Sequence, residues 1–173
     1  MYYIAIISNN FPKENTVQKI TPFLWFDDNA EDAVNFYTSI FKDSKIENIS
    51  HYGDEGPGPA GSVMMANFKL NGQDFMVLNG GPEFTFSEAI SFFVSCETQA
   101  EVDYYWDRLS EGGETQQCGW LKDKFGLSWQ IVPTALGELM GDKDPEKAGR
   151  VMQAMLKMVK IDIAGLQQAY DQE

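Results

Sequence analysis

The amino-acid sequence predicts an α+β protein made of two β-α-β-β-β modules in tandem, followed by C-terminal helices. Strand, amphipathic helix and further strands follow one another in residues 19–82, and the same order returns in residues 87–133. Displacing the chain by 69 residues, so that Tyr37 falls on Trp106, superimposes the two predicted helix faces, which indicates an internal repeat. We assign residues 134–173 to a helical segment and residues 1–18 to an N-terminal extension, so that the paired modules span 19–133.

The first module begins with a strand predicted over Ile20–Phe26, where β-branched and aromatic residues gather. Asp28 and Glu31 have the spacing of a helix capping box, and apolar residues then recur at steps of three and four up to Lys42. Three further strands are predicted over Lys45–Tyr52, Ser62–Leu70 and Gln73–Asn79. Asn71-Gly72 joins the last two, because this pair favours the tight turn of a hairpin.

The second module repeats this order. A strand is predicted over Ile90–Cys96, Thr98 and Glu101 form a clearer capping box, and Gly112-Gly113 stops the helix. Short strands follow, over Glu114–Cys118, Gly119–Leu121 and Leu127–Val132.

The last predicted strand has two unlike faces. Alternation places Leu127, Trp129 and Ile131 on one side and Ser128, Gln130 and Val132 on the other. The first set predicts a core face. The second, with an amide at its centre, suits either the floor of a ligand cup or an ordinary solvent face.

The C-terminal segment has a different pattern. Thr134–Met140 is predicted as a short helix, and Asp144-Pro145-Glu146 begins another. One face of that second helix is predicted to carry Met152, Met155, Leu156, Val159 and Ile163. A methionine stripe at helical spacing indicates core packing, within the chain or against a second copy, in preference to a cofactor role.

Composition narrows the classes of function. A formal net charge of −13 repels nucleic acid and anionic membrane surfaces, so we expect neither as a partner. No apolar run reaches the roughly 18 residues of a membrane span. Two cysteines are too few for a disulfide framework, so we expect a cytoplasmic protein. Twelve Phe, seven Tyr and four Trp favour core packing or a pocket for an apolar ligand.

Few side chains are candidates for catalysis. His51 is the single histidine, so a metal site with several imidazoles is excluded and a Ser-His-Asp or Cys-His system has to use this residue. Its simplest role is that of a surface strand residue. Cys118 has no basic neighbour outside a turn, which favours an inert thiol. Asp123 is an acid–base candidate, although an exposed turn carboxylate is the ordinary case.

Ordered sequence blocks across about residues 19–170 carry a family resemblance. They are Ile20-Thr21-Pro22-Phe23-Leu24-Trp25-Phe26-Asp27, Ala30-Glu31, Phe36-Tyr37, Ala89-Ile90-Ser91-Phe92, Glu101-Val102-Asp103-Tyr104-Tyr105-Trp106, Gly112-Gly113, and Cys118-Gly119-Trp120 with Asp123, Gly126, Ser128-Trp129-Gln130 and Pro133. With these blocks the chain resembles the PhnB-like family of the vicinal-oxygen-chelate superfamily, the group of glyoxalase I, bleomycin-resistance proteins and extradiol dioxygenases. The resemblance implies two modules of the glyoxalase/bleomycin-resistance type, each a curved sheet around a cup with helices on the outer side.

The same resemblance bears on metal binding. Metal-using relatives place His, Gln or Glu at the start of the first strand and the end of the last strand of each module. Here Pro22 holds the first-strand position of the first module, and Ile90 or Ser91 that of the second. Gln130 and Asn79 fall on the late-strand positions. An amide is a poor ligand without imidazole or carboxylate company, so we expect no metal and no other cofactor.

Our leading hypothesis is a homodimer that binds a small, partly apolar molecule in a sheet-lined cup. We predict Asn79, Ser128 and Gln130 as its polar ligand-binding groups. Leu24 and Phe26 are predicted as apolar walls, because strand alternation places them on the cup side. No residue is assigned to catalysis.

Two alternatives stay open. Many PhnB-like proteins carry the inherited label 3-demethylubiquinone-9 3-methyltransferase, so one alternative is an enzyme, either metal-dependent or acting on a quinone-like phenol. Common methyl-donor sites need a glycine-rich turn between a strand and a helix, whereas Gly56 to Gly61 belong to a Pro-rich loop with no following helix. The other alternative, a drug-sequestering resistance protein, differs from the leading hypothesis only in its ligand.

Overall fold

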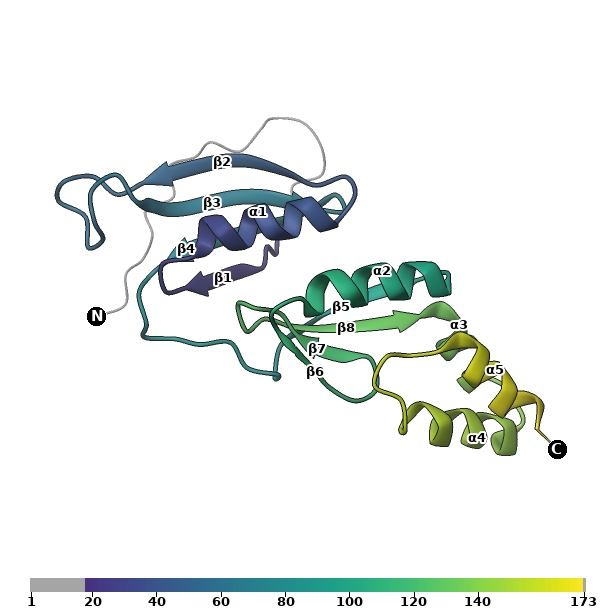
Figure 1. The fold of residues 1–173 in the computed structure, drawn as a ribbon. Helices are drawn as coiled ribbons and strands as arrows, with labels where there is room; N and C mark the ends of the chain where they lie inside the picture. The colour runs from purple at the N-terminus through teal and green to yellow at the C-terminus, as the bar shows by residue number, and fades with distance from the viewer. Residues whose placement is uncertain (1–17, 173) are drawn as a thin grey trace.

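Two four-stranded sheets, each with one long helix on it, follow one another along the chain (Figure 1). The computed structural model describes residues 18–172, so residues 1–17 of the predicted N-terminal extension lie outside the described part. The first module comprises β1 (Phe23–Phe26), α1 (Ala30–Ile40), β2 (Lys45–His51), β3 (Val63–Leu70) and β4 (Gln73–Asn79). The second comprises β5 (Ser91–Cys96), α2 (Gln99–Ser110), β6 (Glu114–Thr115), β7 (Trp120–Lys122) and β8 (Ser128–Pro133). The chain continues with α3 (Thr134–Met140), α4 (Pro145–Met155) and α5 (Ile163–Asp171).

The two sheets share one topology. Sheet 1 has the strand order β1-β4-β3-β2, and sheet 2 has the corresponding order β5-β8-β7-β6. In each sheet the first and last strands of the module pair in parallel, and the other pairs are antiparallel. The tandem β-α-β-β-β fold predicted from the sequence is therefore confirmed. None of the helices within residues 18–172 has the length and apolar character that crossing a bilayer requires.

Local signals in the sequence account for several element ends. Asn71 and Gly72 both adopt positive φ, at 48° and 78°, as the tight turn between β3 and β4 requires. The predicted capping box at α2 is present, because the Thr98 hydroxyl accepts a hydrogen bond from the Glu101 amide at 3.2 Å. Glu101 in turn accepts one from the Glu97 amide at 2.7 Å.

The capping box predicted at Asp28 is wrong. The residue before α1 is Asn29, and its side chain makes no capping hydrogen bond. The first helical amide, that of Ala30, donates instead to Asn79 Oδ1 at 2.8 Å, from the end of β4. A side chain distant in the sequence thus satisfies the helix start, which local spacing cannot reveal.

The two long helices pack in one core between the two sheets. Phe41, which follows α1, stacks on Tyr105 of α2 at 5.1 Å and on Trp129 of β8 at 5.4 Å between ring centroids. Phe75 of sheet 1 meets Phe92 of sheet 2 edge-on at 5.3 Å. The family resemblance implies a cup on one side of each sheet and helices on the other side. In this chain each sheet does carry its long helix on one side only. The helix-covered faces of the two sheets point toward each other.

A buried carboxylate joins the two modules. Asp123, in the turn between β7 and β8, is only 3% exposed, so the prediction of an exposed turn carboxylate is wrong. Its Oδ2 accepts hydrogen bonds from the Tyr37 hydroxyl of α1 and from Trp129 Nε1, both at 2.8 Å. Its Oδ1 accepts from the amides of Phe125 at 2.9 Å and Leu127 at 3.1 Å. One side chain thus shapes the hairpin turn and fastens α1 against β8.

The prediction of one continuous C-terminal helix that reaches Ile163 is also wrong. The chain forms two helices there, and the intervening segment pairs with the second module. The amide of Cys118 donates to the Met158 carbonyl, and the amide of Gly119 donates to the Val159 carbonyl, both at 2.8 Å. These bonds attach the segment to the second module, and Val159 is 45% exposed instead of lying on a packed helix face.

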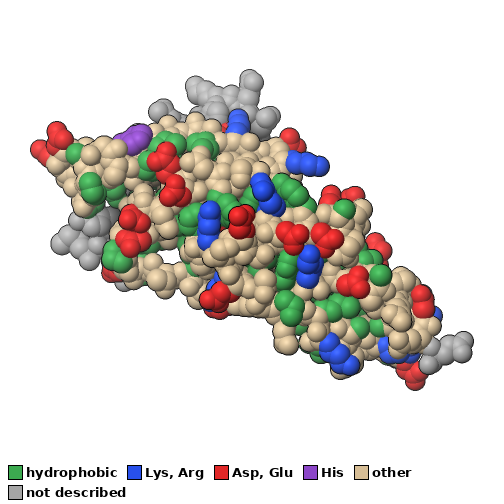
Figure 2. All heavy atoms as spheres, in the orientation of Figure 1, with side chains coloured by type: hydrophobic (Ala, Val, Ile, Leu, Met, Phe, Trp, Pro, Cys, Tyr) green, Lys and Arg blue, Asp and Glu red, His purple; other side chains and the backbone are tan. Residues whose placement is uncertain are grey.

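Charged side chains of both signs are spread along the surface (Figure 2). The single imidazole, that of His51, lies exposed near the end of β2, as predicted for a surface strand residue.

Removing the Tyr37 hydroxyl should loosen the junction between the modules. We expect Tyr37→Phe to lower the free energy of unfolding by about 1–3 kcal/mol, because a buried carboxylate loses one of its donors. Urea denaturation measures the change. Tyr104→Phe is the matched control, because that hydroxyl also crosses between the modules, to the Ile40 carbonyl at 3.0 Å, but its residue is 44% exposed. Equal effects of the two variants would contradict a special role for Tyr37.

The pH dependence of stability should report on Asp123. Burial raises the pKa of its carboxyl, and the four donors oppose that rise only in part. A group whose pKa is higher in the folded than in the unfolded state stabilises the fold most at low pH, and this contribution is lost as pH rises through the folded pKa. We therefore expect Asp123→Asn to lower the unfolding free energy more at about pH 4 than at about pH 8. Parallel denaturation curves at both pH values measure this, and a loss that grows with pH would refute it.

Candidate functional site

Each sheet has a second face, which points away from the helices and which we call its open face. Residues paired across neighbouring strands lie on the same side, so the register defines this surface. The open face of sheet 1 consists of two rows, Phe23, Met76, Asn67 and Asn48, then Trp25, Leu78, Met65 and Ser50. Hydrocarbon and aromatic rings fill its β1 and β4 side, and polar groups stand on β2. The face is therefore largely apolar, with an amide in its interior.

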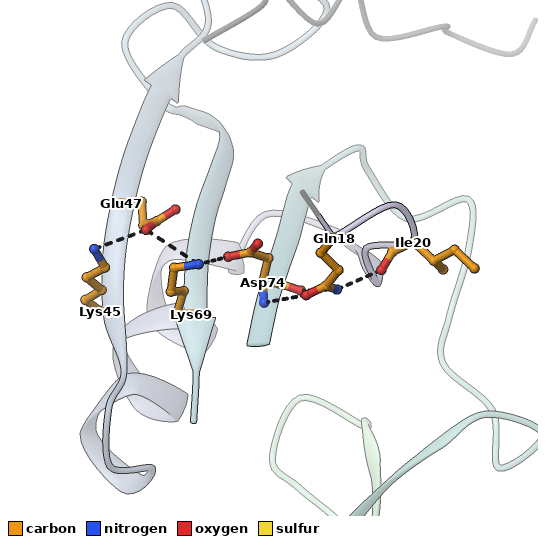
Figure 3. A network of polar contacts seen from close by, with 6 residues as sticks. All are labelled: Gln18, Ile20, Lys45, Glu47, Lys69 and Asp74. Atoms are coloured by element: carbon orange, nitrogen blue, oxygen red, sulfur yellow. Dashed lines mark hydrogen bonds and ion pairs between the residues drawn. The ribbon is translucent and has the colours of Figure 1, made fainter. Parts of the chain in front are cut away.

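A chain of charged side chains closes one end of this face (Figure 3). Lys69 forms ion pairs with Asp74 and, at 3.9 Å, with Glu47, which also pairs with Lys45 at 3.2 Å. The hydrogen bond from Lys69 to Asp74 raises the pKa of the Lys69 ammonium group. Gln18 completes the network by accepting from the Asp74 amide at 3.2 Å. Two cations and two anions thus balance one another, so this end presents no net charge.

Asn67 lies in the middle of the open face of sheet 1. Its Oδ1 is buried and has no hydrogen-bond partner. Our sequence-based prediction missed this residue. The signal that points to it is an Asn in the interior of a strand, where this residue type is depleted.

The open face of sheet 2 is more polar. It consists of the rows Phe93, Gln130 and Trp120, then Ser91, Ser128 and Lys122. The Gln130 amide donates to the Ser91 hydroxyl at 2.8 Å. Ser128 is 1% exposed, and its hydroxyl has no partner. Both residues lie on the side that alternation predicted, opposite the buried Trp129 and Ile131.

Leu24 and Phe26 do not lie on an open face. They are buried in the core, at 7% and 3% exposure. Phe26 packs edge-on against Phe86 at 5.1 Å and Phe125 at 6.2 Å, on the side of sheet 1 that α1 covers. The alternation proposed for β1 was therefore assigned to the wrong side of the sheet.

Asn79 faces the same core. Its Oδ1 accepts from the Ala30 amide, and its Nδ2 donates to the Val63 carbonyl at 3.0 Å. The structure thus uses this side chain to begin α1. Of the five residues predicted to share one ligand surface, it brings together only Ser128 and Gln130.

The side chains at the positions that carry metal in related proteins do not fit a metal ion. Pro22 has no donor atom in its side chain, and Asn79 points into the core. Gln130 is hydrogen-bonded to Ser91. Both side chains are neutral, and neutral amides and hydroxyls are weak metal ligands without carboxylate or imidazole neighbours. Across residues 18–172 there is no group of three or more His, Cys, Asp or Glu side chains suited to a metal.

The two thiols lie in different settings. Cys96 is fully buried at the end of β5, and burial raises its pKa to about 11. Cys118 is half-buried and adopts a positive φ of 62° at the start of the segment that leads into β7. Neither thiol lies on an open face.

Replacing Asn79 should test its structural role. We expect Asn79→Ala to lower the free energy of unfolding by about 2–3 kcal/mol, because it leaves a buried amide and a buried carbonyl without partners. Asn48→Ala, at an exposed position of β2, should change it by less than about 0.5 kcal/mol. Thermal and urea denaturation measure both. A loss for Asn79→Ala no greater than the loss for Asn48→Ala would show that the helix start does not depend on this side chain.

Comparison with solved structures identifies similar proteins. The PhnB protein from Bacillus cereus, described as a 3-demethylubiquinone-9 3-methyltransferase, is 43% identical, with 68% of this chain and 100% of that chain covered and a TM-score of 0.64. Protein PA1353 from Pseudomonas aeruginosa is 23% identical over 66% of this chain and 96% of that chain, with a TM-score of 0.56. A mutant of the fosfomycin resistance protein FosX from Listeria monocytogenes, solved with Mn(II) and a dihydroxypropylphosphonic acid, is 15% identical over 66% of this chain and 88% of that chain, with a TM-score of 0.46.

No curated protein matches the chain. A family model described as 3-demethylubiquinone-9 3-methyltransferase matches residues 18–132, which is more than half of the sequence and spans both modules up to β8. The chain therefore belongs to this family, the PhnB-like family of the vicinal-oxygen-chelate superfamily that its sequence blocks resemble.

Proposed function

We propose that this protein binds a small, partly apolar molecule against the open face of sheet 1, in a cup that a second copy of the chain completes. The observation that carries the proposal is the composition of that face. An antiparallel sheet with one buried side ordinarily exposes polar residues on the other. Here Trp25, Met65, Met76 and Leu78 occupy the side away from the core. Such a surface favours binding, because covering it releases about 25 cal/mol per Å² of apolar area.

The direction of the two open faces supports a homodimer. The helix-covered faces of both sheets meet in one core, so the open faces point away from each other and, within residues 18–172, do not enclose a ligand together. Phe23 at the start of β1 is 42% exposed and Phe93 of β5 is 60% exposed. Placing sheet 2 of one copy over sheet 1 of another would cover both rings and enclose the ligand between them.

Charge supports a small molecule over a polyanion. The formal net charge of −13 opposes nucleic acid and anionic membranes at long range. On the open faces themselves the charges are paired, Lys69 with Asp74 and Lys122 with Glu88. Apolar contact and hydrogen bonding, not net charge, would then select the ligand.

The methyltransferase description of the family does not favour an enzymatic alternative in this chain. The glycine-rich loop Gly53–Gly61 connects two antiparallel strands, β2 and β3, and no helix follows it. A side chain at Gly56 or Gly58 would collide with the ring of Tyr52, so these glycines allow the loop to pack on that ring. They do not form the strand-to-helix turn that commonly cradles a methyl donor. The side chains at the metal-binding positions of related proteins, described above, likewise give no reason to propose a metal-dependent enzyme.

Disrupting the exposed ring of sheet 2 should test the dimeric cup. We expect the wild-type protein to be a dimer by light scattering, and Phe93→Glu to be a folded monomer. We expect at least one class among quinones, aromatic antibiotics and small oxo-acids to stabilise the wild type, by about 1.4 kcal/mol at ten times its Kd, and Phe93→Glu to lose that stabilisation. Leu156→Glu is the control, at a residue 46% exposed and outside both open faces, and it should stay dimeric and bind.

A monomeric wild-type protein would refute the shared cup. Stabilisation by none of these ligand classes would refute the binding function.

A further inference from the structure

The amide of Asn67 occupies the interior of the open face of sheet 1. In its row it stands between Met76 of β4 and Asn48 of β2. Along β3, Met65 and Lys69 are its neighbours on the same face. Its Oδ1 has no hydrogen-bond donor although the atom is buried. A buried acceptor without a donor destabilises the fold, and native proteins contain few of them.

The charged side chains nearby are already engaged. Lys69, the cation closest along the strand, is held by Asp74 and Glu47 (Figure 3). The row on the other side, with Trp25, Leu78 and Met65, consists of hydrocarbon and aromatic groups. The surroundings of Asn67 therefore suit an uncharged molecule with an apolar body.

We propose that Asn67 Oδ1 accepts a hydrogen bond from an O–H or N–H group of an uncharged ligand, and so selects phenols, alcohols or amides over analogues without a donor. This inference rests on the proposed function, because it names the class of molecule that the open face of sheet 1 binds. A buried acceptor discriminates strongly, since an analogue that lacks the donor leaves it unpaired. Asn67 is then a residue that determines specificity.

A matched pair of probes tests the proposal, with 1-naphthol as the donor and 1-methoxynaphthalene as the same ring system without one. Isothermal titration with the full-length wild-type protein should give about tenfold tighter binding of 1-naphthol. In Asn67→Leu the two probes should bind equally. Asn48→Leu, the control in the same row with the acceptor intact, should keep the preference.

Stability of the free protein provides a second measurement. Asn67→Leu removes an unpaired acceptor and leaves a side chain of similar size, so its Tm should equal or exceed that of the wild type. A purely structural Asn67 would instead lower Tm on replacement, and this result would overturn the proposal.

The other outcomes separate this inference from the proposed function. Equal binding of both probes by the wild type would overturn the role of Asn67 while leaving the binding function in place. A shift of the monomer–dimer equilibrium in Asn67→Leu with the naphthol preference intact would assign the missing donor to the second copy, and would also overturn the inference. Binding of neither probe would overturn both the role of Asn67 and the proposed binding of aromatic molecules to the open face of sheet 1.

Discussion

The arrangement of this molecule depends on the buried carboxylate of Asp123. An ionisable group in a core is tolerated only when its oxygens are fully hydrogen-bonded. Asp123 meets this condition with two amides of its own turn and two side chains, Tyr37 and Trp129. Because Tyr37 belongs to the first module and Trp129 to the second, the group that shapes the β7–β8 hairpin also sets how the modules face each other. The aromatic packing around Phe41 then fills the space between them.

This junction decides which surfaces are left for binding. With both long helices enclosed between the sheets, the other face of each sheet points away from this shared core. In the proposed dimer a second copy of the chain would cover the apolar part of the face of sheet 1. The strong negative charge opposes association of copies, although salt screens it beyond about 8–10 Å. The lysines of the open faces are paired within the chain, Lys69 in sheet 1 and Lys122 in sheet 2. Local neutrality at these two faces keeps close approach compatible with a net charge of −13.

The sequence predicts the helices and strands of this fold better than it predicts which side of each strand faces the core. Helix periodicity, the Asn71-Gly72 turn and the Thr98 cap depend on neighbouring residues, and the structure has all of them. The faces of sheet 1 depend on register. The helices repeat at 69 residues, but the first strands, β1 and β5, repeat at 70, because Phe26 pairs with Asn79 at the end of sheet 1 as Cys96 pairs with Pro133 at the end of sheet 2. A slip of one residue exchanges the two sides of a strand, and this explains why Leu24 and Phe26 were assigned to the cup. Asp123 and Asn79 were misjudged because their partners lie 86 and 49 residues away.

The buried polar side chains of the described residues divide in a way that bears on function. Those in the core are bonded: Asp123 has four donors, and Asn79 makes hydrogen bonds with both ends of its amide. The two atoms without partners, Asn67 Oδ1 and Ser128 Oγ, belong to strand positions on the open faces, one in each sheet. If these atoms were unpaired only because packing is imperfect, we would expect to find them in the core, because the core holds most of the buried side chains. Their position on the faces that point away from the shared core supports the proposal that a bound molecule supplies the donor for Asn67 Oδ1.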